Sequence, residues 1–195
     1  MTTIYSPLSL TPVNEDRIEV TITYLEQTAR PLLPKPVAPA RKTALMRAYC
    51  PPVHFYRYLY DLIGTPYNWI SRRKLNDDEL MEIIQHDDNY LYVFYVDGAP
   101  AGMAEIDARK GDEHELKFFG LAPDFVGGGL GRFFLTNVID LAWSLNPKKL
   151  SLETCTLDHP AALPFYQKLG FKVVDRRSGV VERLPEFKPP AKNRS

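Results

Sequence analysis

The chain has 195 residues, of which 45% are hydrophobic and 25% are charged, which is enough for one domain with a sizeable core and no disulfide framework. Its 24 basic and 24 acidic residues give a net charge of +0, which counts against nucleic acid or a membrane surface as a partner. No apolar run is long enough to cross a bilayer, and the first residues lack the pattern of a signal peptide. We therefore expect a soluble, cytoplasmic protein.

The first half of the chain contains one strand signal and two helix signals. Residues 17–25 alternate between apolar and polar side chains, which predicts a half-buried strand. A proline-rich stretch over 31–39 follows and is typical of an extended connector. Apolar residues then recur at helical spacing over 53–63. A second helix is expected to begin at Asn76, because Glu79 stands three residues after this N-cap residue.

The second half begins as a meander of strands and continues as alternating strands and helices. The expected strands are 90–96, 101–108, 113–121, 149–155 and 171–174, and the expected helices lie within 130–145 and 158–169. This order predicts an α/β fold with a mixed sheet. A single domain is expected over 1–178, with the first strand and two helices in 17–88 and the core in 89–175. A polar, proline-containing tail is expected over 179–195.

Four glycines crowd residues 126–132 (VGGGLGR), directly before the expected helix 130–145. Glycine lets the backbone approach a ligand, and the N–H groups of such a loop and of the first helical turn can together hold an anion such as a pyrophosphate. The alternative is a flexible surface loop. The stretch is not a P-loop, since no Gly-Lys-Ser/Thr follows, and it does not match the GxGxxG dinucleotide pattern.

The histidines and cysteines indicate neither a metal site nor a thiol nucleophile. His54, His86, His114 and His159 are scattered, without the spacing of metal ligands. Cys155 lies in an expected strand, where a free cysteine is usually a small core hydrophobe. No metal is therefore expected.

A resemblance to a known family rests on the strand EHELKFFGLAPDF, the loop VGGGLGR and the later segment LDHPAALPFYQKLGF. Together they resemble the GNAT superfamily of acetyl-CoA-dependent N-acetyltransferases. The pyrophosphate signature of that family is Gln/Arg-x-x-Gly-x-Gly/Ala. Here Gly129 and Gly131 take the two small positions, whereas Val126 departs from the signature at its first position.

The later segment matches a second element of the family. Ala162 and Tyr166 stand at the expected spacing and are followed by Gly-Phe at 170–171. Where many relatives have an asparagine near the start of this helix, the chain has Asp158 and His159.

The resemblance extends over residues 90–175 and implies both a fold and a co-substrate. The implied fold is a mixed, mostly antiparallel central sheet flanked by helices, in which strands 113–121 and 149–155 splay apart to form the acetyl-CoA cleft. The implied co-substrate is acetyl-CoA. The residues expected to bind it are Phe119, Gly120, Leu121, Val126, Gly127, Gly128, Gly129, Leu130, Gly131, Arg132, Asp158 and His159.

Tyr166 is expected to be the general acid. When an amine attacks a thioester, the leaving thiolate must be protonated, and a phenol at the pocket can supply this proton. The alternative is that Tyr166 is only a core aromatic of an amphipathic helix.

Glu115 is the candidate base, because an amine that arrives as an ammonium must lose a proton before it attacks. The resemblance places a catalytic glutamate at this strand position in some relatives, whereas others use water or a different residue. Glu105 and Glu153 are rival carboxylates, and a simple salt bridge is the alternative role for Glu115. By strict alternation, Glu115 shares a face of its strand with Lys117 and Phe119.

The acceptor pocket is expected between the first strand and the meander, chiefly over residues 54–73, with Tyr58 and Trp69 as contacts. The alternative is that these rings pack the helices onto the sheet.

The predicted function is transfer of an acetyl group from acetyl-CoA to a primary amine of a small molecule or peptide, by direct transfer in a ternary complex. No metal, nucleic-acid or membrane partner is expected, and a homodimer is one option. Two other functions stay open: a non-catalytic acyl-CoA-binding or sensor module, and a nucleotide-binding protein that uses the glycine loop for another phosphate.

Overall fold

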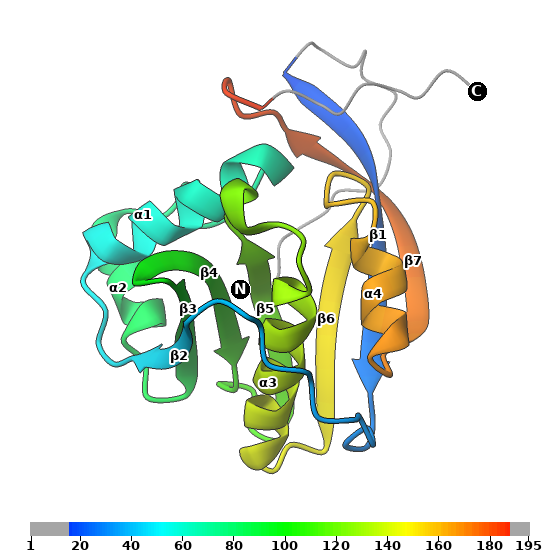
Figure 1. Cartoon of the computed structure of the whole chain (residues 1–195). Helices are drawn as coiled ribbons and strands as arrows, with labels where there is room; N and C mark the ends of the chain where they lie inside the picture. Colours follow the sequence, from blue (N-terminus) through cyan, green and yellow to red (C-terminus); the bar gives the residue numbers. More distant parts are fainter. Residues whose placement is uncertain (1–15, 188–195) are drawn as a thin grey trace.

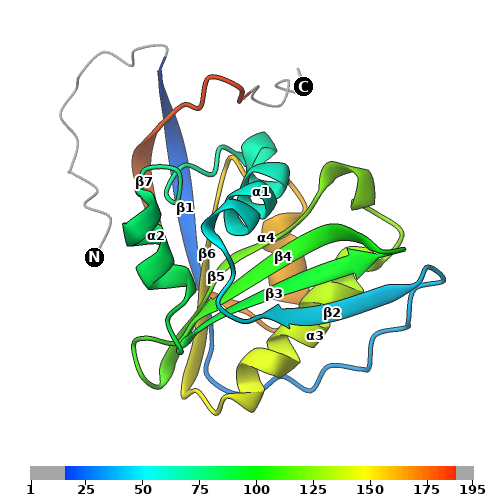
Figure 2. The same ribbon diagram turned by 90° about the vertical axis from the view of Figure 1, so that its left-hand side faces the viewer.

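The computed structural model describes residues 16–187, in which seven strands form one sheet with helices on both faces (Figure 1). The strands are β1 (Arg17–Gln27), β2 (Thr43–Ala48), β3 (Asn89–Val96), β4 (Ala99–Asp107), β5 (Glu113–Leu121), β6 (Lys149–Cys155) and β7 (Lys172–Glu182). The helices are α1 (Val53–Gly64), α2 (Asp77–Ile84), α3 (Leu130–Ser144) and α4 (Ala162–Lys168), with the short 3₁₀ turns η1 (Thr65–Tyr67) and η2 (Pro123–Phe125). Helices α1 and α2 cover one face of the sheet, and α3 and α4 cover the other (Figure 2). None of these described helices is both long and apolar enough to cross a membrane.

The sheet has the strand order β2-β3-β4-β5-β6-β1-β7. Every neighbouring pair is antiparallel except β5 and β6, which are parallel. The parallel pair arises because α3 carries the chain from the end of β5 back to the start of β6. The predicted α/β fold with a mixed, mostly antiparallel sheet is thus confirmed.

Two local signals act as the sequence predicts. Asn76 and Glu79 form a reciprocal capping box at the start of α2, in which each side chain accepts a hydrogen bond of 2.9 Å from the backbone N–H of the other. Asp97 and Gly98 have φ values of 49° and 87° and connect β3 to β4 by a tight turn. Both features depend only on neighbouring residues.

The first strand does not join the meander. β1 lies between β6 and β7, so that Ile22 pairs with Cys155 on one side and with Arg177 on the other. The position beside β3 is taken by β2, an edge strand that the sequence analysis did not predict. The connector between β1 and β2 crosses over α3, where Arg30 forms a 2.9 Å ion pair with Asp140 (Figure 1).

After α4, regular structure extends beyond residue 178, where the sequence analysis placed the end of the domain. β7 continues past residue 178 to Glu182, so the expected end of the domain falls inside a strand. Asn68 holds the segment that follows, because its side chain donates to the carbonyl of Glu182 at 2.8 Å and accepts from the N–H of Leu184 at 2.7 Å. Phe187 is buried against β1. The rest of the expected tail lies outside the described residues.

Candidate functional site

Strands β5 and β6 run side by side only at their beginnings. Residues 113–115 of β5 pair with residues 149–151 of β6, and no later pair joins the two strands in the described chain. The strands therefore separate toward their carboxyl ends, where the glycine loop follows β5 and the turn into α4 follows β6 (Figure 1). The splayed strands expected for the cleft are present.

The backbone at the end of β5 has hydrogen-bonding groups that face this gap. Ala122 donates its N–H to the carbonyl of Ala101 at 2.8 Å. Gly120 lies two residues earlier, opposite Met103, so its N–H and carbonyl also point toward β4. Because these groups alternate along an antiparallel strand, those of Phe119 and Leu121 point away from β4. They face the side from which β6 has separated, as expected for residues that hold an extended ligand arm.

The glycine loop has a backbone conformation that L-residues adopt rarely. Gly127, Gly128 and Gly129 have φ values of 108°, 57° and 80°, and a Cβ atom at any of them would meet nothing within 4 Å. Glycine is therefore required by the conformation and not by crowding. The N–H groups of Gly131 and Arg132 lie in the first turn of α3, where a helix offers them no backbone partner. The loop and helix start thus form an open cradle suited to an anion.

The side chains around this cradle take three different positions. Val126 is exposed and offers no charge or hydrogen bond to a phosphate. Leu130 is buried in the core and fixes the start of α3. Arg132 is exposed in the first helical turn.

Tyr166 lies in α4 with 9% of its surface exposed. Its ring centroid is 6.1 Å from that of Phe171 in an edge-on arrangement and 6.3 Å from that of Phe165. Burial, together with the negative charge of Asp158, raises the pKa of the Tyr166 hydroxyl well above its usual value. The phenol keeps its proton at neutral pH, as any tyrosine does, and the raised pKa makes it a weaker acid than an exposed tyrosine.

Asp158 and His159 stand in the turn between β6 and α4 but face different surroundings. Asp158 is half-buried; burial raises the pKa of its carboxyl, and Thr154, Cys155 and Trp69 lower it in part. His159 is exposed, and its Nδ1 accepts a 3.1 Å hydrogen bond from the N–H of Ala161. Burial and the Asp158 charge raise the pKa of the neighbouring Cys155 thiol to about 11, which agrees with a cysteine that is not a nucleophile.

A β-bulge changes the face on which Glu115 lies. Leu116 and Phe118 are opposite consecutive residues of β4, so Lys117 between them is bulged. Glu115 consequently lies on the α1 face together with Phe118, whereas Phe119 packs on the α3 side against the helix. The expectation that Glu115 and Phe119 share a face is wrong, because strict alternation does not continue through a bulge.

Glu115 is half-buried and is paired with a lysine. The Nζ atom of Lys117 lies 2.8 Å from Oε1 of Glu115 and 3.8 Å from Oε1 of Glu153, and Lys110 lies 3.9 Å from the other oxygen of Glu115. Burial lowers the pKa of Lys117, but the two carboxylates more than offset this and raise it overall. Lys117 therefore stays protonated and occupies Oε1 of Glu115. If Glu115 transfers a proton, a water molecule has to carry it.

The aromatic residues expected at the acceptor pocket differ in position. Trp69 packs on Tyr60 and Phe118, with ring centroids 5.4 and 5.0 Å away. A Cβ atom on Gly120 would lie 3.5 Å from the Trp69 ring, so Trp69 covers the end of β5 beside the gap. Tyr58, in contrast, is 52% exposed on α1, two residues from the buried Tyr60. The structure brings Trp69 to the site and leaves Tyr58 facing solvent.

This difference predicts opposite results for two alanine variants. If Trp69 walls the acceptor pocket as the sequence analysis predicts, Trp69→Ala should raise the KM of the amine acceptor about tenfold without changing the affinity for CoA. Tyr58→Ala should change neither the KM nor, beyond about 0.5 kcal/mol, the stability. Steady-state kinetics, CoA calorimetry and thermal melting measure these effects. A larger rise of KM in the Tyr58 variant would mean that the acceptor binds elsewhere.

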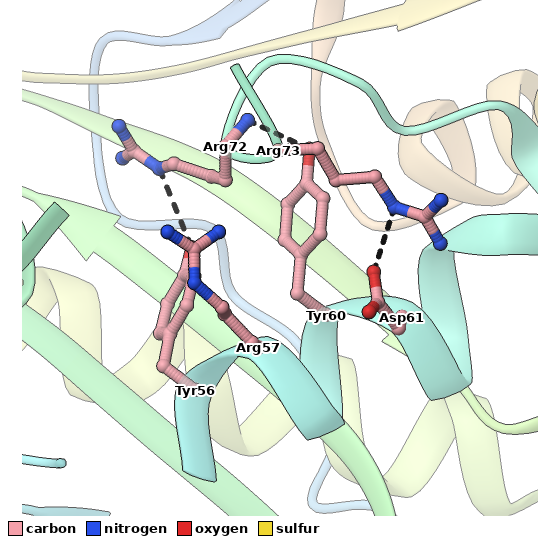
Figure 3. A pocket seen from close by; sticks show the side chains of 6 residues that line it. All are labelled: Tyr56, Arg57, Tyr60, Asp61, Arg72 and Arg73. Atoms are coloured by element: carbon pink, nitrogen blue, oxygen red, sulfur yellow. Dashed lines mark hydrogen bonds and ion pairs between the residues drawn. The ribbon is translucent and has the colours of Figure 1, made fainter. Parts of the chain in front are cut away.

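Glu105, one of the rival bases, is enclosed in the core. It is 0% exposed, pairs with Arg72 and accepts a hydrogen bond from Tyr56, while Nε of Arg72 donates to the Tyr56 hydroxyl at 3.3 Å. Figure 3 shows Tyr56 and Tyr60 pointing from α1 toward Arg72 and Arg73 around a small pocket. Glu105 therefore anchors the segment after η1 and cannot meet a substrate. A single glutamate in an apolar strand was the only sequence signal for this network.

The comparisons identify the class of protein that this fold and site define. A family model described as the acetyltransferase (GNAT) family matches residues 56–171, which is more than half of the chain. The chain belongs to the GNAT acetyltransferase family.

Solved structures share the fold at low identity. A functionally unknown conserved protein from Staphylococcus epidermidis is 18% identical, with a TM-score of 0.61, 86% of this chain and 64% of that one covered. A GCN5-related N-acetyltransferase from Sphaerobacter thermophilus is 15% identical, with a TM-score of 0.62 and coverages of 87% and 55%. A GNAT family acetyltransferase from Elizabethkingia anophelis with acetyl-CoA bound is 20% identical, with a TM-score of 0.50 and coverages of 68% and 78%. The chain thus spans less than two thirds of the first two structures, and no curated protein matches it.

Proposed function

We propose that this chain transfers an acetyl group from acetyl-CoA to a primary amine, by direct transfer in a ternary complex. The observation that carries the proposal is the gap between β5 and β6, because it lies between the anion cradle at the start of α3 and helix α4, which carries Tyr166 (Figure 1). The acetyl-CoA bound to the similar structure from Elizabethkingia anophelis supports the choice of co-substrate.

The residues of β5 and the glycine loop would hold the CoA moiety. Loop N–H groups around Gly129 and the first turn of α3 bind the pyrophosphate, with Arg132 as a nearby cation. The outward backbone groups of Phe119 and Leu121 bind the pantetheine arm. One of these N–H groups also donates to the thioester carbonyl and stabilises the negative charge that develops on its oxygen.

The proton transfers are assigned to two side chains. Glu115, through a water molecule that it orients, takes a proton from the ammonium, and the free amine nitrogen then attacks the thioester carbon. When the carbon–sulfur bond breaks, Tyr166 gives its hydroxyl proton to the CoA thiolate. The products are the acetylated amine and CoA.

A non-catalytic acyl-CoA-binding module is the second candidate, and one observation favours it. Glu115 is already paired with Lys117, so the proposed base is not free in this conformation. Such a module would bind acetyl-CoA without consuming it.

Calorimetry with CoA, ATP and NAD, followed by a turnover assay with amines, tests these functions. We expect CoA alone to bind, and acetyl-CoA to be consumed with at least one class among alkylamines, amino acids, polyamines, aminoglycosides and peptides. Binding of CoA without turnover would favour the non-catalytic module. Binding of ATP or NAD but not CoA would contradict both.

A further inference from the structure

Asp158 lies where the two faces of the sheet meet in the gap. It follows β6 in the turn toward α4, and its charge acts on Tyr166 on one side and on Tyr67 of η1 on the other. Trp69, which covers the end of β5, is near enough to lower the pKa of the Asp158 carboxyl. Asp158 is therefore shared between the side assigned to CoA and the side that carries the acceptor pocket.

Only hydrogen-bond donors hold the Asp158 carboxylate. Its Oδ2 accepts from the hydroxyl of Thr154 at 2.6 Å and from the N–H of Cys155 at 2.9 Å. Burial raises its pKa, and these two donors, together with Trp69, lower it only in part. Within residues 16–187 no lysine, arginine or histidine forms an ion pair with Asp158.

The other carboxylates named as candidate bases do have cations. Glu115 and Glu153 both lie within 4 Å of the Lys117 ammonium, and Glu105 is paired with Arg72. A carboxylate in a partly desolvated position is more stable with a cation beside it, and the attraction is stronger than in water.

We propose that Asp158 receives the ammonium group of the acceptor and thereby selects amines that are cationic at neutral pH. This inference rests on the proposed acetyl transfer and names the class of acceptor for that same site. The ammonium supplies the missing cation between Tyr67, Trp69 and Tyr166. The nitrogen is then already beside the gap in which the thioester is held. Its proton has to pass through several water molecules to reach Glu115, because Glu115 pairs with Ser151, four residues (about 13 Å) before Cys155.

The test compares Asp158→Asn with native protein and with Asp175→Asn as a matched control. Asp175 lies on β7, two strands away from β6, and is paired with Arg177 at 2.7 Å. Asparagine at 158 keeps an oxygen that can accept from Thr154 and Cys155, so the turn is preserved while the charge is lost. For the best alkylamine substrate of the panel, we expect the KM to rise about 10- to 100-fold in Asp158→Asn and to stay unchanged in Asp175→Asn.

Two further readouts separate ammonium recognition from a purely structural role. The KM of acetyl-CoA should change much less than that of the alkylamine in Asp158→Asn, and an aromatic amine that is neutral at pH 7 should show the same KM in native and variant protein. An equal KM for the alkylamine in both proteins would overturn the inference while leaving the proposed acetyl transfer intact. Failure of the native protein to bind CoA, or to acetylate any amine, would overturn the proposed function and the inference with it.

The native protein offers a second test if Asp158→Asn does not fold. Tyr67, Tyr166, Cys155 and the adjacent His159 are titratable groups beside Asp158, and the first three have raised pKa values, so they stay neutral while Asp158 titrates. If an ammonium is bound, the alkylamine KM should be flat below the pKa of the amine and rise only when acid protonates Asp158. If only free amine is bound, KM should rise tenfold per pH unit from the amine pKa downward, which would overturn the proposal.

Discussion

Replacing Tyr166 with phenylalanine is expected to lower the turnover of acetyl-CoA by about 10²–10⁴-fold, because the general acid is lost. Phenylalanine keeps the ring that packs edge-on against Phe171 and beside Phe165. The affinity for CoA and the melting temperature should therefore remain close to their native values. Stopped-flow detection of released CoA in single-turnover conditions measures the chemical step directly.

The pH dependence offers a control for this assignment. Because burial and Asp158 raise the pKa of Tyr166, the native phenol remains protonated through neutral and moderately alkaline pH. The rate lost in Tyr166→Phe should thus be constant over this range and should shrink only where the native hydroxyl ionises. A variant that turns over at the native rate would show that Tyr166 is a core aromatic and no more.

Gly129→Glu should weaken CoA binding by at least about 100-fold. Two like charges about 4 Å apart repel by roughly 4 kcal/mol at an effective dielectric constant near 20, and each 1.4 kcal/mol corresponds to about a tenfold change in affinity. The variant also places a side chain at a φ of 80°, which is strained in any L-residue. Calorimetric titration with CoA measures the loss.

Gly129→Gln separates charge from strain, because glutamine has nearly the same size and the same unfavourable φ but no charge. We expect it to bind CoA at least about tenfold more tightly than Gly129→Glu. Equal affinities in the two variants would mean that the loop conformation, and not repulsion of a pyrophosphate, causes the loss. Native affinity in a folded Gly129→Glu variant would remove the pyrophosphate from this loop altogether.

The sequence predicted most elements whose signals are local. The capping box at Asn76 and the turn at Asp97-Gly98 depend on residues that touch within one turn of chain, and both are present. The order of the meander and of the later helices also follows from periodicity. The family resemblance covers residues 90–175, which include the meander and the later helices. It therefore supports the prediction mainly in the region where periodicity already indicated the elements.

The features that sequence analysis missed depend on partners far along the chain. β2 is only six residues long, and nothing in TALMRA says that it pairs with β3 at the edge of the sheet. The bulge at Lys117 comes from the register against β4, so it is invisible in β5 alone. The approach of Trp69 to Asp158 likewise requires α1 and the end of β6 to be placed in space first.

The position of β1 affects how the protein can fold. Ile22 finds its strand partners Cys155 and Arg177 more than a hundred residues later in the chain, whereas β2 to β5 pair mainly with near neighbours. During synthesis the meander can form early, while β1 must wait with both edges unpaired until β6 and β7 leave the ribosome. We therefore expect the β6–β1–β7 half to be completed last, and its slow, long-range closure to be the step at which newly made chains are most prone to aggregate.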